Sequence, residues 1–499
     1  MSDETHSAST PLDLKLRKNP DCAYLRNLYL QTSNVNISTR NKQDVYRLIL
    51  LMTPAPPTKG PWIHGRKNIP LGLTYVAAAL EKSGFQVQMI DNYMLEKPIE
   101  EIKAELAKLK PEIVGITCSS VTYSRVIETA KAVKETVPAC KVVVGGWHAS
   151  YEPETLLQNP EVDYVVMGEG ECAMAQLANY IVKGDEANYP FRIAGLAYRN
   201  DGKIVKNQRQ FIANMDEIPF PAWHLLPMDR YVREMEYLNV KPVDNVSIAR
   251  GCSFSCAFCE TTGLMGRTCR TFSPQRVVDE IKYLMANFGT KGVYFINDNF
   301  TIKKKETIEL CRLIRENKID LQWVCDTRAD LLSKELLQEM KSAGCKTIWF
   351  GIESGSPRIL EKINKGVTVE QTERAFELCR DEGIQTACSF LLGIPGETVE
   401  DMKTSFKFAR KLDPDFCRWN IYIAVPGSPL YDEVMQNHLY DQIEDYAAYV
   451  KTDDFDYASL LKIQRQFHMS FNKSPKRILH KIKREGLWTV IKKAPMMLS

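Results

Sequence analysis

Gly251-Cys252-Ser253-Phe254-Ser255-Cys256-Ala257-Phe258-Cys259 is the stretch on which the interpretation of the whole sequence depends. Its cysteines have the spacing C-x-x-x-C-x-x-C, which is typical of a short loop that wraps around a four-iron cluster and supplies three of its four iron ligands. Four protein ligands close off a metal, whereas three thiolates leave one iron free to bind a small molecule. The loop therefore predicts Cys252, Cys256 and Cys259 as ligands of a reactive [4Fe-4S] cluster.

Zinc is the main alternative for three neighbouring cysteines. Zinc motifs usually combine C-x-x-C with a second C-x-x-C or H-x-x-x-H pair. No second pair follows this loop, because Cys269 stands alone and the nearest upstream histidine is His224. The pattern favours the iron-sulfur cluster and leaves a non-catalytic zinc-binding module as the alternative.

The composition is that of a folded globular protein. The 499 residues are enough for two or three domains of roughly 100–200 residues each. Hydrophobic residues make up 44% and charged residues 25%, close to globular averages, which excludes disordered and fibrous classes. The formal net charge of +3 gives no electrostatic reason to expect a nucleic-acid partner.

Three features predict a cytoplasmic location. No run of about 18 apolar residues is present. The first residues, Met1 to His6, lack the basic and apolar segments of a signal peptide. The 14 cysteines are scattered, many of them within apolar strand patterns, which fits reduced thiols better than a disulfide framework.

From residue 45 onward, strand-like and helix-like segments alternate. A buried strand at 48–52 is followed by a helical stripe formed by Leu73, Val76, Ala77 and Leu80, which Gly84 ends. A second helix is predicted at 99–109, and further strands are predicted at 85–91, 113–117, 141–144 and 163–167. Such alternation builds an α/β doubly wound parallel sheet, which we place at residues 45–185 after a flexible N-terminal arm at 1–44.

Small and hydroxyl-bearing residues follow three of these strands. They are Thr117-Cys118-Ser119-Ser120, Gly145-Gly146-Trp147-His148-Ala149-Ser150 and Gly168-Glu169-Gly170-Glu171. Doubly wound sheets bind ligands beyond the carboxyl ends of their strands. Glycines there let backbone N–H groups approach a ligand closely, and hydroxyls can hydrogen-bond to it. Each run alone is also explained by turn chemistry, but the three together predict a ligand site.

A connector at 186–236 and a second domain at 237–435 follow. The connector contains a predicted hairpin with Asn200-Asp201-Gly202 as its turn. In the second domain Ser273 and Pro274 mark the start of a helix, and strands are predicted at 246–249, 293–296, 323–326, 347–351, 386–392 and 416–423. Six strand-helix units are too few to close an eight-fold barrel, so we expect an open partial (β/α)6 barrel. Barrels carry their chemistry at the carboxyl ends of the strands, where the cysteine loop lies.

The second domain resembles the radical S-adenosylmethionine (SAM) superfamily, and the first resembles its cobalamin-binding partner domain. Anaerobic magnesium-protoporphyrin ester cyclases and class B radical SAM methyltransferases combine these two domains. The resemblance covers about residues 45–435. In the second domain it rests on the cysteine motif and on Phe295-Ile296-Asn297-Asp298-Asn299-Phe300, Gly351-Ile352-Glu353-Ser354-Gly355-Ser356 and Gly393-Ile394-Pro395-Gly396-Glu397. In the first domain it rests on Pro70-Leu71-Gly72-Leu73, on Gly145 to Ser150 and on Val166 to Glu171.

The resemblance implies how SAM is bound and used. The open iron would chelate SAM, and one electron from a donor protein would yield methionine and a 5′-deoxyadenosyl radical that abstracts hydrogen. The residues implied in SAM binding are Phe258, Asp298, Arg328, Glu353 and Ser354. Asp298 is the expected partner of the SAM amine, because Asn297-Asp298-Asn299 replaces the Gly-Gly-Glu run of many relatives. A salt bridge at the barrel mouth is the alternative for Glu353, and a structural role is the alternative for Arg328.

Cobalamin is the third cofactor that the resemblance implies. Its contacts would be Thr117, Ser119, Ser120, Gly145, Gly146, Trp147, His148, Gly168, Glu169 and Gly170. The D-x-H-x-x-G run that gives cobalt a histidine in mutase-type domains is absent, because Asn92-Tyr93-Met94 follows Asp91. Cobalamin is therefore expected to bind without that ligand. There are two alternatives. In one, Trp147 and His148 pack at a domain interface, and in the other the domain is vestigial and empty.

The C-terminal region, 436–499, is predicted to be helical and basic. Residues 473–493 contain eight lysines and arginines but one acid, Glu485, and an apolar stripe through Ile478, Ile482 and Trp488. A basic amphipathic helix can lie on an anionic membrane surface, which would suit a lipid-like substrate. The alternative is a terminal helix packed on the barrel.

The leading hypothesis is an enzyme that methylates an unactivated carbon of a small-molecule substrate. SAM would be both radical source and methyl donor, and methylcobalamin would carry the methyl group. The first alternative is radical cyclisation or rearrangement without methyl transfer. The second, from another class, is the zinc-binding module.

Overall fold

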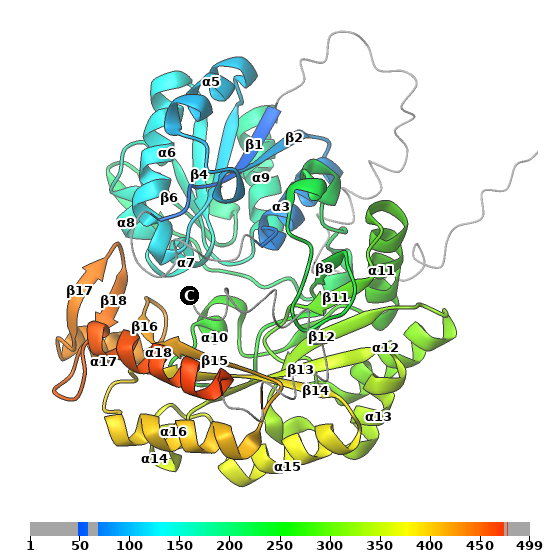
Figure 1. Cartoon of the computed structure of the whole chain (residues 1–499). Coiled ribbons are helices and arrows are strands. Elements are labelled where there is room, and N and C mark those ends of the chain that lie inside the picture. Colours follow the sequence, from blue (N-terminus) through cyan, green and yellow to red (C-terminus); the bar gives the residue numbers. More distant parts are fainter. Residues whose placement is uncertain (1–47, 58–67, 474–476, 478–499) are drawn as a thin grey trace, which may run out of the picture.

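Residues 48–57, 68–473 and 477 are described by the structure, which is a computed structural model. The predicted arm at 1–44 lies outside the described residues, as does the predicted basic tail apart from Lys473 and Arg477. In Figure 1 two α/β units lie one above the other, the first in blue and cyan and the second in green and yellow. The C-terminal elements, in orange and red, lie beside the second unit.

The first unit is a seven-stranded sheet with the order β2-β1-β3-β4-β5-β6-β7. Its parallel strands are β1 Leu48–Thr53, β2 Gln86–Asp91, β3 Ile113–Thr117, β4 Lys141–Gly145 and β5 Tyr164–Val166. Every residue of β1 is buried, as expected of a central strand covered on both faces. The strand order reverses between β1 and β3, and doubly wound folds bind ligands beside such a point.

Helices cover both faces of this sheet. On one face α3 (Leu71–Lys82) contacts α9 (Gly170–Lys183), and on the other α5 (Ile99–Leu109) contacts α6 (Tyr123–Thr136). The short helices are α4 Asn92–Leu95, α7 Trp147–Tyr151 and α8 Pro153–Leu157. Each face of the sheet has its own apolar core. The predicted doubly wound α/β fold is therefore confirmed.

The sheet continues into the segment predicted as a connector. β6 (Leu196–Asn200) and β7 (Lys203–Lys206) form the expected hairpin. Its turn residues Asp201 and Gly202 have positive φ angles of 48° and 76°, which suit a tight two-residue turn. Because β6 pairs antiparallel with β5, this hairpin is part of the first sheet rather than a separate linker.

The second unit is a six-stranded parallel sheet with the order β15-β14-β13-β12-β11-β8. The strands are β8 Val243–Val246, β11 Gly292–Phe295, β12 Gln322–Thr327, β13 Cys345–Glu353, β14 Gln385–Leu392 and β15 Phe416–Ile421. Among the described strands, the edge strands β8 and β15 do not pair with each other. The expected open partial barrel is therefore confirmed.

Helices cover the outer face of the barrel and enclose the main apolar core. They are α11 Pro274–Phe288, α12 Lys304–Glu316, α13 Lys334–Ser342, α14 Pro357–Lys362, α15 Val369–Asp381 and α16 Val399–Leu412. α11 begins as predicted, because Ser273 Oγ accepts a hydrogen bond from Arg276 N at 3.3 Å and Pro274 occupies the first turn.

The first barrel strand begins earlier than predicted, at Val243 instead of Val246. The apolar pattern is misleading there because Asp244 is charged yet 1% exposed. Arg233 neutralises it through two bonds, Nε to Oδ1 at 2.8 Å and Nη2 to Oδ2 at 2.6 Å. The chain then turns into β9 (Ala249–Arg250), which pairs antiparallel with β10 (Arg270–Thr271). The cysteine loop lies between β9 and β10, together with α10 (Thr261–Met265).

A small antiparallel sheet precedes the predicted C-terminal helix. Its strands are β16 Ile423–Ala424, β17 Tyr440–Glu444 and β18 Ala447–Val450, and α17 (Pro429–Gln436) and α18 (Tyr457–Asn472) flank the hairpin. The region from 436 is thus not helical throughout. At its end Arg477 pairs with Asp413 at 3.1 Å and lies over the Phe471 ring, so this basic residue packs on the barrel.

The tip of the β17–β18 hairpin reaches the first unit. Asp445 Oδ2 accepts hydrogen bonds from N and Oγ of Ser124, at 3.3 and 3.1 Å, in the first turn of α6. The Tyr446 ring packs against Tyr123 and His148, with centroids 4.9 and 4.4 Å away. The hairpin therefore joins the two units.

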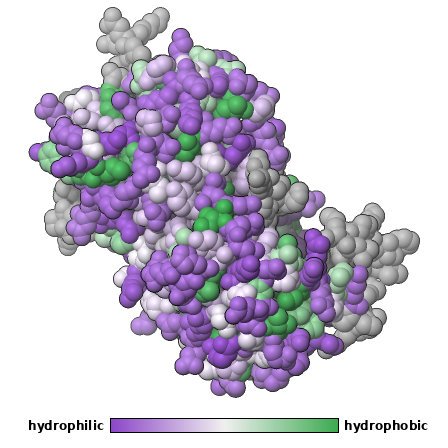
Figure 2. Space-filling model, turned by 90° about the vertical axis from the view of Figure 1, so that its left-hand side faces the viewer, coloured by the Kyte–Doolittle hydropathy of each residue, from purple (hydrophilic) through white to green (hydrophobic). Residues whose placement is uncertain are grey.

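The face of the molecule in Figure 2 is mostly hydrophilic, and its apolar residues form small separate patches. None of the helices in the described ranges is both long enough and apolar enough to cross a membrane.

Candidate active site

A cavity of about 600 Å³ lies between the two units. The first unit lines it with the carboxyl ends of β3 and β4, the residues around the start of α3, and the Gly168–Glu171 run. The second unit lines it with Ser247, Ala249 and Arg250 before the cysteine loop, Leu264 and Met265 after it, and Ile296 to Asp298 after β11. The ligand-binding edge of the first sheet and the surroundings of the cysteine loop therefore open into one space.

Most residues predicted to contact cobalamin line this cavity. They are Thr117, Gly145, Gly146, Trp147, Gly168, Glu169 and Gly170. The Trp147 side chain is 36% exposed, and an open aromatic face of this size is suited to contact with a large ring-shaped ligand. Gly146 has a φ of 102°, and a Cβ there would lie 2.8 Å from Cys118 O, so this close turn requires glycine.

The cavity extends inward between the first sheet and α9. Leu51, Gly115, Val143, Val166 and Met174 line this apolar recess. A Cβ at Gly115 would lie 2.7 Å from Leu51 Cδ2 and 3.5 Å from Met174 Cε, so the glycine keeps the recess open. An open apolar recess beside a glycine-lined sheet edge fits a bulky ligand such as cobalamin.

Ser119, Ser120 and His148, which were also predicted to contact cobalamin, are not among the residues that line this cavity. His148 is 1% exposed, and its ring nitrogens lie 3.3 Å from Ser120 Oγ and 3.1 Å from Thr155 Oγ1. Burial lowers the pKa of His148 to about 4, so the ring is neutral at physiological pH. Ser119 caps the short helical turn Ser120–Thr122. His148 also packs at the interface between the units, against the Tyr446 ring.

A buried network of ion pairs connects the first unit to the start of the cysteine loop. Arg250 donates to Glu169 Oε1 from Nη1 at 2.9 Å and to Glu171 Oε1 from Nη2 at 2.5 Å. Arg270 Nη1 donates to Glu169 Oε2 at 2.8 Å, and Ile212 N donates to the same oxygen at 2.8 Å. The Glu169 carboxylate is thus fully used within the protein, so its side chain joins the units instead of contacting a ligand.

Burial and neighbouring charges shift the pKa of Arg250 in opposite directions. Burial lowers its pKa, but the carboxylates of Glu171 and Glu169 outweigh this, and the pKa ends well above its ordinary value. The Arg250 guanidinium also lies 5.2 Å from the centroid of the Tyr75 ring, which lines the same cavity. Arg250 immediately precedes Gly251, so these contacts fix the point where the cysteine loop begins.

The cysteine loop is held from the other side by residues 363–366. Ala257 N donates to Ile363 O at 2.8 Å, and Asn364 Nδ2 donates to Ser255 O at 3.0 Å. The Arg328 guanidinium lies 3.6 Å from the centroid of the Phe254 ring. Gly251 has a φ of 89°, and a Cβ there would lie 2.5 Å from Thr268 O. The loop is therefore anchored at Gly251 and, between the cysteines, at Phe254, Ser255 and Ala257.

The three loop cysteines are half-buried free thiols. Burial raises the pKa of Cys252 and of Cys259, and hydrogen bonds from the Phe254 backbone and from Thr261 partly offset it. A bound metal cluster deprotonates such thiols, and hydrogen bonds to the sulfurs tune its potential. No three His, Cys, Asp or Glu side chains in the described ranges converge on a point for one metal ion. Three free thiols on one loop match a cluster with three protein ligands and one open iron.

Two residues predicted to bind SAM have other partners. Every Arg328 nitrogen donates within the protein, Nε and Nη2 to Asp330 at 3.0 and 3.1 Å and Nη1 to Lys365 O at 2.7 Å. These contacts connect Arg328 to the segment that holds the cysteine loop. Ser354 is fully buried, and its Oγ lies 3.1 Å from Ser405 Oγ of α16, which points it away from the barrel mouth.

Glu353 remains at the barrel mouth beside the cysteine loop. Its Oε1 accepts from Lys365 Nζ at 2.9 Å, and this Nζ lies 5.6 Å from the centroid of the Phe258 ring. Glu353 has a φ of 68°, a strained conformation for a non-glycine residue that clusters at functional sites. A Cβ at Gly351 would lie 2.4 Å from Glu353 Oε1, so glycine is required for this arrangement.

Asn297 and Asp298 line the cavity after β11. Asp298 Oδ1 accepts from Thr261 Oγ1 at 3.1 Å, which ties it to the segment after Cys259. Both polar atoms of the Asn297 amide are buried and have no hydrogen-bond partner in the part of the chain that the structure describes. Buried polar groups are rarely left unpaired, so Asn297 is the stronger candidate for a ligand contact.

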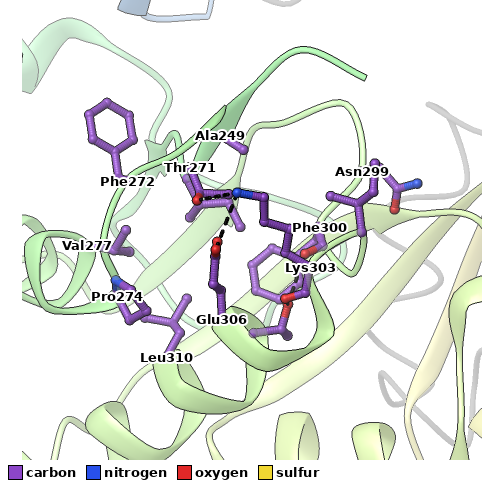
Figure 3. A pocket seen from close by; sticks show the side chains of 13 residues that line it. Ala249, Thr271, Phe272, Pro274, Val277, Asn299, Phe300, Lys303, Glu306 and Leu310 are labelled. Atoms are coloured by element: carbon purple, nitrogen blue, oxygen red, sulfur yellow. Dashed lines mark hydrogen bonds and ion pairs between the residues drawn. The ribbon is translucent and has the colours of Figure 1, made fainter. Parts of the chain in front are cut away.

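A second cavity, of about 20 Å³, lies behind the β9–β10 ribbon. Figure 3 shows Lys303 reaching across it, with Nζ 3.2 Å from Thr271 Oγ1 and 3.3 Å from Glu306 Oε1. A space of this size holds about one water molecule. The Lys303–Glu306 ion pair therefore supports β10 and, through β10, Arg270. The cavity itself is too small to be a ligand site.

Two family models match the sequence. The Radical SAM superfamily model matches residues 246–409, and the B12 binding domain model matches residues 65–178. An uncharacterized methyltransferase of Pyrococcus horikoshii is 34% identical over 445 residues, 87% of this chain and 94% of that protein. The anaerobic magnesium-protoporphyrin IX monomethyl ester cyclase of Rubrivivax gelatinosus is 31% identical over 407 residues, 79% of this chain and 71% of that protein. The chain belongs to the radical SAM enzymes that carry a B12-binding domain.

Among solved structures, the cobalamin-dependent SAM radical enzyme OxsB with aqua-cobalamin and SAM bound has the same fold. Its TM-score is 0.69 at 16% identity, over 92% of this chain and 73% of that one. As a radical SAM enzyme with a B12-binding domain, the protein uses a [4Fe-4S] cluster, SAM and cobalamin as cofactors. The prediction of an enzyme is confirmed, and the alternative of a zinc-binding module is not.

Several residues of the site were not singled out in the sequence. Arg250 directly precedes the cysteine motif, whereas Arg270 and Lys365 lie outside the quoted motifs. Their partners Glu169, Glu171 and Glu353 lie within other motifs. The signal in the sequence was Arg250, a basic residue directly before the predicted metal-binding loop. A charge buried at such a place requires an opposite charge beside it, which predicts an ion pair there.

Replacing Arg250 with methionine is expected to separate the two units. It would leave Glu169 and Glu171 buried with less compensation, at a cost of about 3–5 kcal/mol, measured as a lower melting temperature and urea midpoint. Arg312→Met is the matched control, because Arg312 pairs with Glu309 and Glu316 on the exposed surface and should cost less than about 1 kcal/mol. Equal effects of the two substitutions would contradict the proposed importance of the network.

The variant Gly115→Ala is expected to weaken cobalamin binding about tenfold, since shifting buried side chains to fit an extra methyl group typically costs about 1–3 kcal/mol. The added methyl displaces Leu51 into the recess. The measurement is a cobalamin titration followed by absorbance, with iron content and SAM affinity as internal controls that should not change. Unaltered cobalamin affinity would show that the recess is not part of the cobalamin site.

Proposed function

We propose that this enzyme transfers a methyl group to an unactivated carbon of a small-molecule substrate. The observation that carries the proposal is the shared cavity, into which both the cobalamin-type sheet edge and the residues flanking the cysteine loop open. A methyl carrier on one wall and a radical source on the other would then face the same substrate. The name of the Pyrococcus horikoshii relative, a methyltransferase, supports this proposal.

The cofactors supply the hard chemistry: reductive cleavage of SAM for hydrogen abstraction, and a cobalt-bound methyl group for transfer. The chain's own residues hold and orient them. Cys252, Cys256 and Cys259 bind the cluster as thiolates, and the contacts of Arg328 with Phe254 and of Asn364 with Ser255 keep the loop in one conformation. An electron-donor protein is a further expected partner, because reductive cleavage consumes one electron.

For SAM we propose contacts on two sides of the cysteine loop. On one side Glu353, oriented by Lys365, lies next to Phe258. On the other side the Asn297 amide offers a donor and an acceptor without protein partners, and Asp298 offers a carboxylate. These groups match the hydroxyl, amino and carboxylate groups of SAM.

For cobalamin we propose that Thr117, Gly145, Gly146, Gly168 and Gly170 would hold it, together with the apolar recess at Gly115. No histidine of the described chain lines the cavity, so the protein side would not supply an imidazole to cobalt. Apolar side chains such as Leu71, Leu264 and Met265 cover the space between the two walls and would keep water away from the reacting groups.

Radical cyclisation without methyl transfer is the second candidate. It is supported by the Rubrivivax gelatinosus relative, which is named as a cyclase and matches most of this chain. The two candidates differ in the fate of the SAM methyl group. Only methyl transfer places it in the product.

Anaerobic turnover with methyl-labelled SAM is therefore the deciding experiment. Methyl transfer predicts label in an organic product and two molecules of SAM consumed for each product. A product formed without label would refute the proposal and favour cyclisation. Omission of cobalamin is the control, because it should abolish label transfer while SAM cleavage by the cluster continues.

Cys256→Ala is expected to remove a cluster ligand and abolish SAM cleavage, with a loss of acid-labile sulfide and of the visible absorbance of the cluster. Cys311→Ala is the matched control, because Cys311 is a buried thiol on α12, on the outer face of the barrel. It should keep both iron and activity. Retained SAM cleavage in Cys256→Ala would mean that the ligand assignment is wrong.

A further inference from the structure

The inner face of the barrel differs sharply from its outer face. Successive side chains of a strand point to opposite faces, and in β14 Cys388, Phe390 and Leu392 are buried under the helices while Ser389 and Leu391 are half-buried. In β15 Cys417 and Trp419 are buried while Arg418 and Asn420 are exposed. The inner face of the barrel is therefore only partly covered, and we call the space along it the lumen.

An aromatic floor closes the amino end of this lumen. Tyr237 packs edge-on against Trp349 of β13 and Phe416 of β15, with ring centroids 5.1 and 4.8 Å away. Val243, Val324 and Ala387 complete the floor from three other strands. A ligand in the lumen would thus enter from the carboxyl end, where the cysteine loop and the cavity between the units lie.

A carboxyl group projects into the lumen one layer above this floor. Asp326 of β12 follows Val324 by two residues and therefore lies on the same face. Its Oδ2 accepts a hydrogen bond from the Tyr294 hydroxyl of the neighbouring strand β11. Tyr294 and Trp349 both pack against the floor residues, so the carboxyl has aromatic rings on the two adjacent strands.

No described cation pairs with Asp326. The charged group that acts on Asp326 is Asp298, a like charge. Arg418, on the same side of the barrel, is paired with Glu236 at 2.6 Å and lies over the Tyr237 and Trp349 rings. Burial raises the pKa of Asp326 to about 7; the Tyr294 hydrogen bond lowers it and the Asp298 charge raises it further. A carboxyl group held in a cavity without a cation is a recognised mark of a binding site.

We propose that Asp326 and Tyr294 recognise the substrate in the lumen, and that this substrate carries a cationic nitrogen, such as a protonated amine, on an apolar body. The inference rests on the proposed function, since it names the substrate class for the same site. A cation would give Asp326 the charge partner that the described chain does not provide. The apolar body would fill the space toward the cysteine loop.

The test uses phenethylamine and the neutral 2-phenylethanol as probes. Their binding to the anaerobically reconstituted full chain is measured by ligand-observed NMR at pH 8, so that methyl transfer is not needed for the readout. The wild type should bind the amine at least tenfold more tightly than the alcohol. Asp326→Asn should remove this preference, and Tyr294→Phe should reduce it several-fold. Asp279→Asn, an exposed acid on α11, is the charge-matched control and should keep it.

Two outcomes would overturn the inference. One is equal binding of the two probes by the wild type, and the other is an unchanged preference in Asp326→Asn whose melting temperature equals that of the wild type. A third outcome separates this inference from the proposed function. If the product carries no label but the preference for the amine remains and depends on Asp326, methyl transfer is refuted and the recognition site stands.

Discussion

The ion pairs of Arg250 and Arg270 with Glu169 and Glu171 are the constraint on which the rest of the site depends. Both glutamates follow β5 of the first sheet, and both arginines flank the cysteine loop on β9 and β10. One set of buried charges therefore fixes the proposed cobalamin-binding edge of the first sheet relative to the cysteine loop. Because each charge is buried, neither side can move alone without leaving an unpaired ion, which is costly. The cavity owes its shape to this rigid connection.

The fold was predictable where local signals are strong. The structure has α5 at Ile99–Leu109 and β3 at Ile113–Thr117, with the bounds read from apolar periodicity, and α11 begins at its Ser273–Pro274 cap. The start of β8 was not predictable in this way, because Asp244 is buried only by virtue of Arg233. The β17–β18 hairpin was missed for a related reason. Its first strand is mostly exposed, so it lacks the alternation that marks a half-buried strand.

The site was predictable from the sequence as a set of motifs but not as a set of contacts. The glycines after β4 and β5 line the cavity, since backbone position follows from the strand that precedes it. Side-chain roles depend on partners far away in the sequence. Arg328 covers Phe254, Ser354 contacts Ser405, and His148 lies against Tyr446. No motif specifies these pairs, and they decide which polar side chains are left for a ligand.

The β17–β18 hairpin reaches the first unit through Asp445 and Tyr446, and this has a consequence for biosynthesis. Ribosomes make the chain from its N-terminus, and domains generally fold as units in that order. The cobalamin-type sheet and the cysteine loop are thus complete before the hairpin has emerged. Until it docks, the space between the units has one fewer tether, and large cofactors have their easiest route of entry into the nascent enzyme.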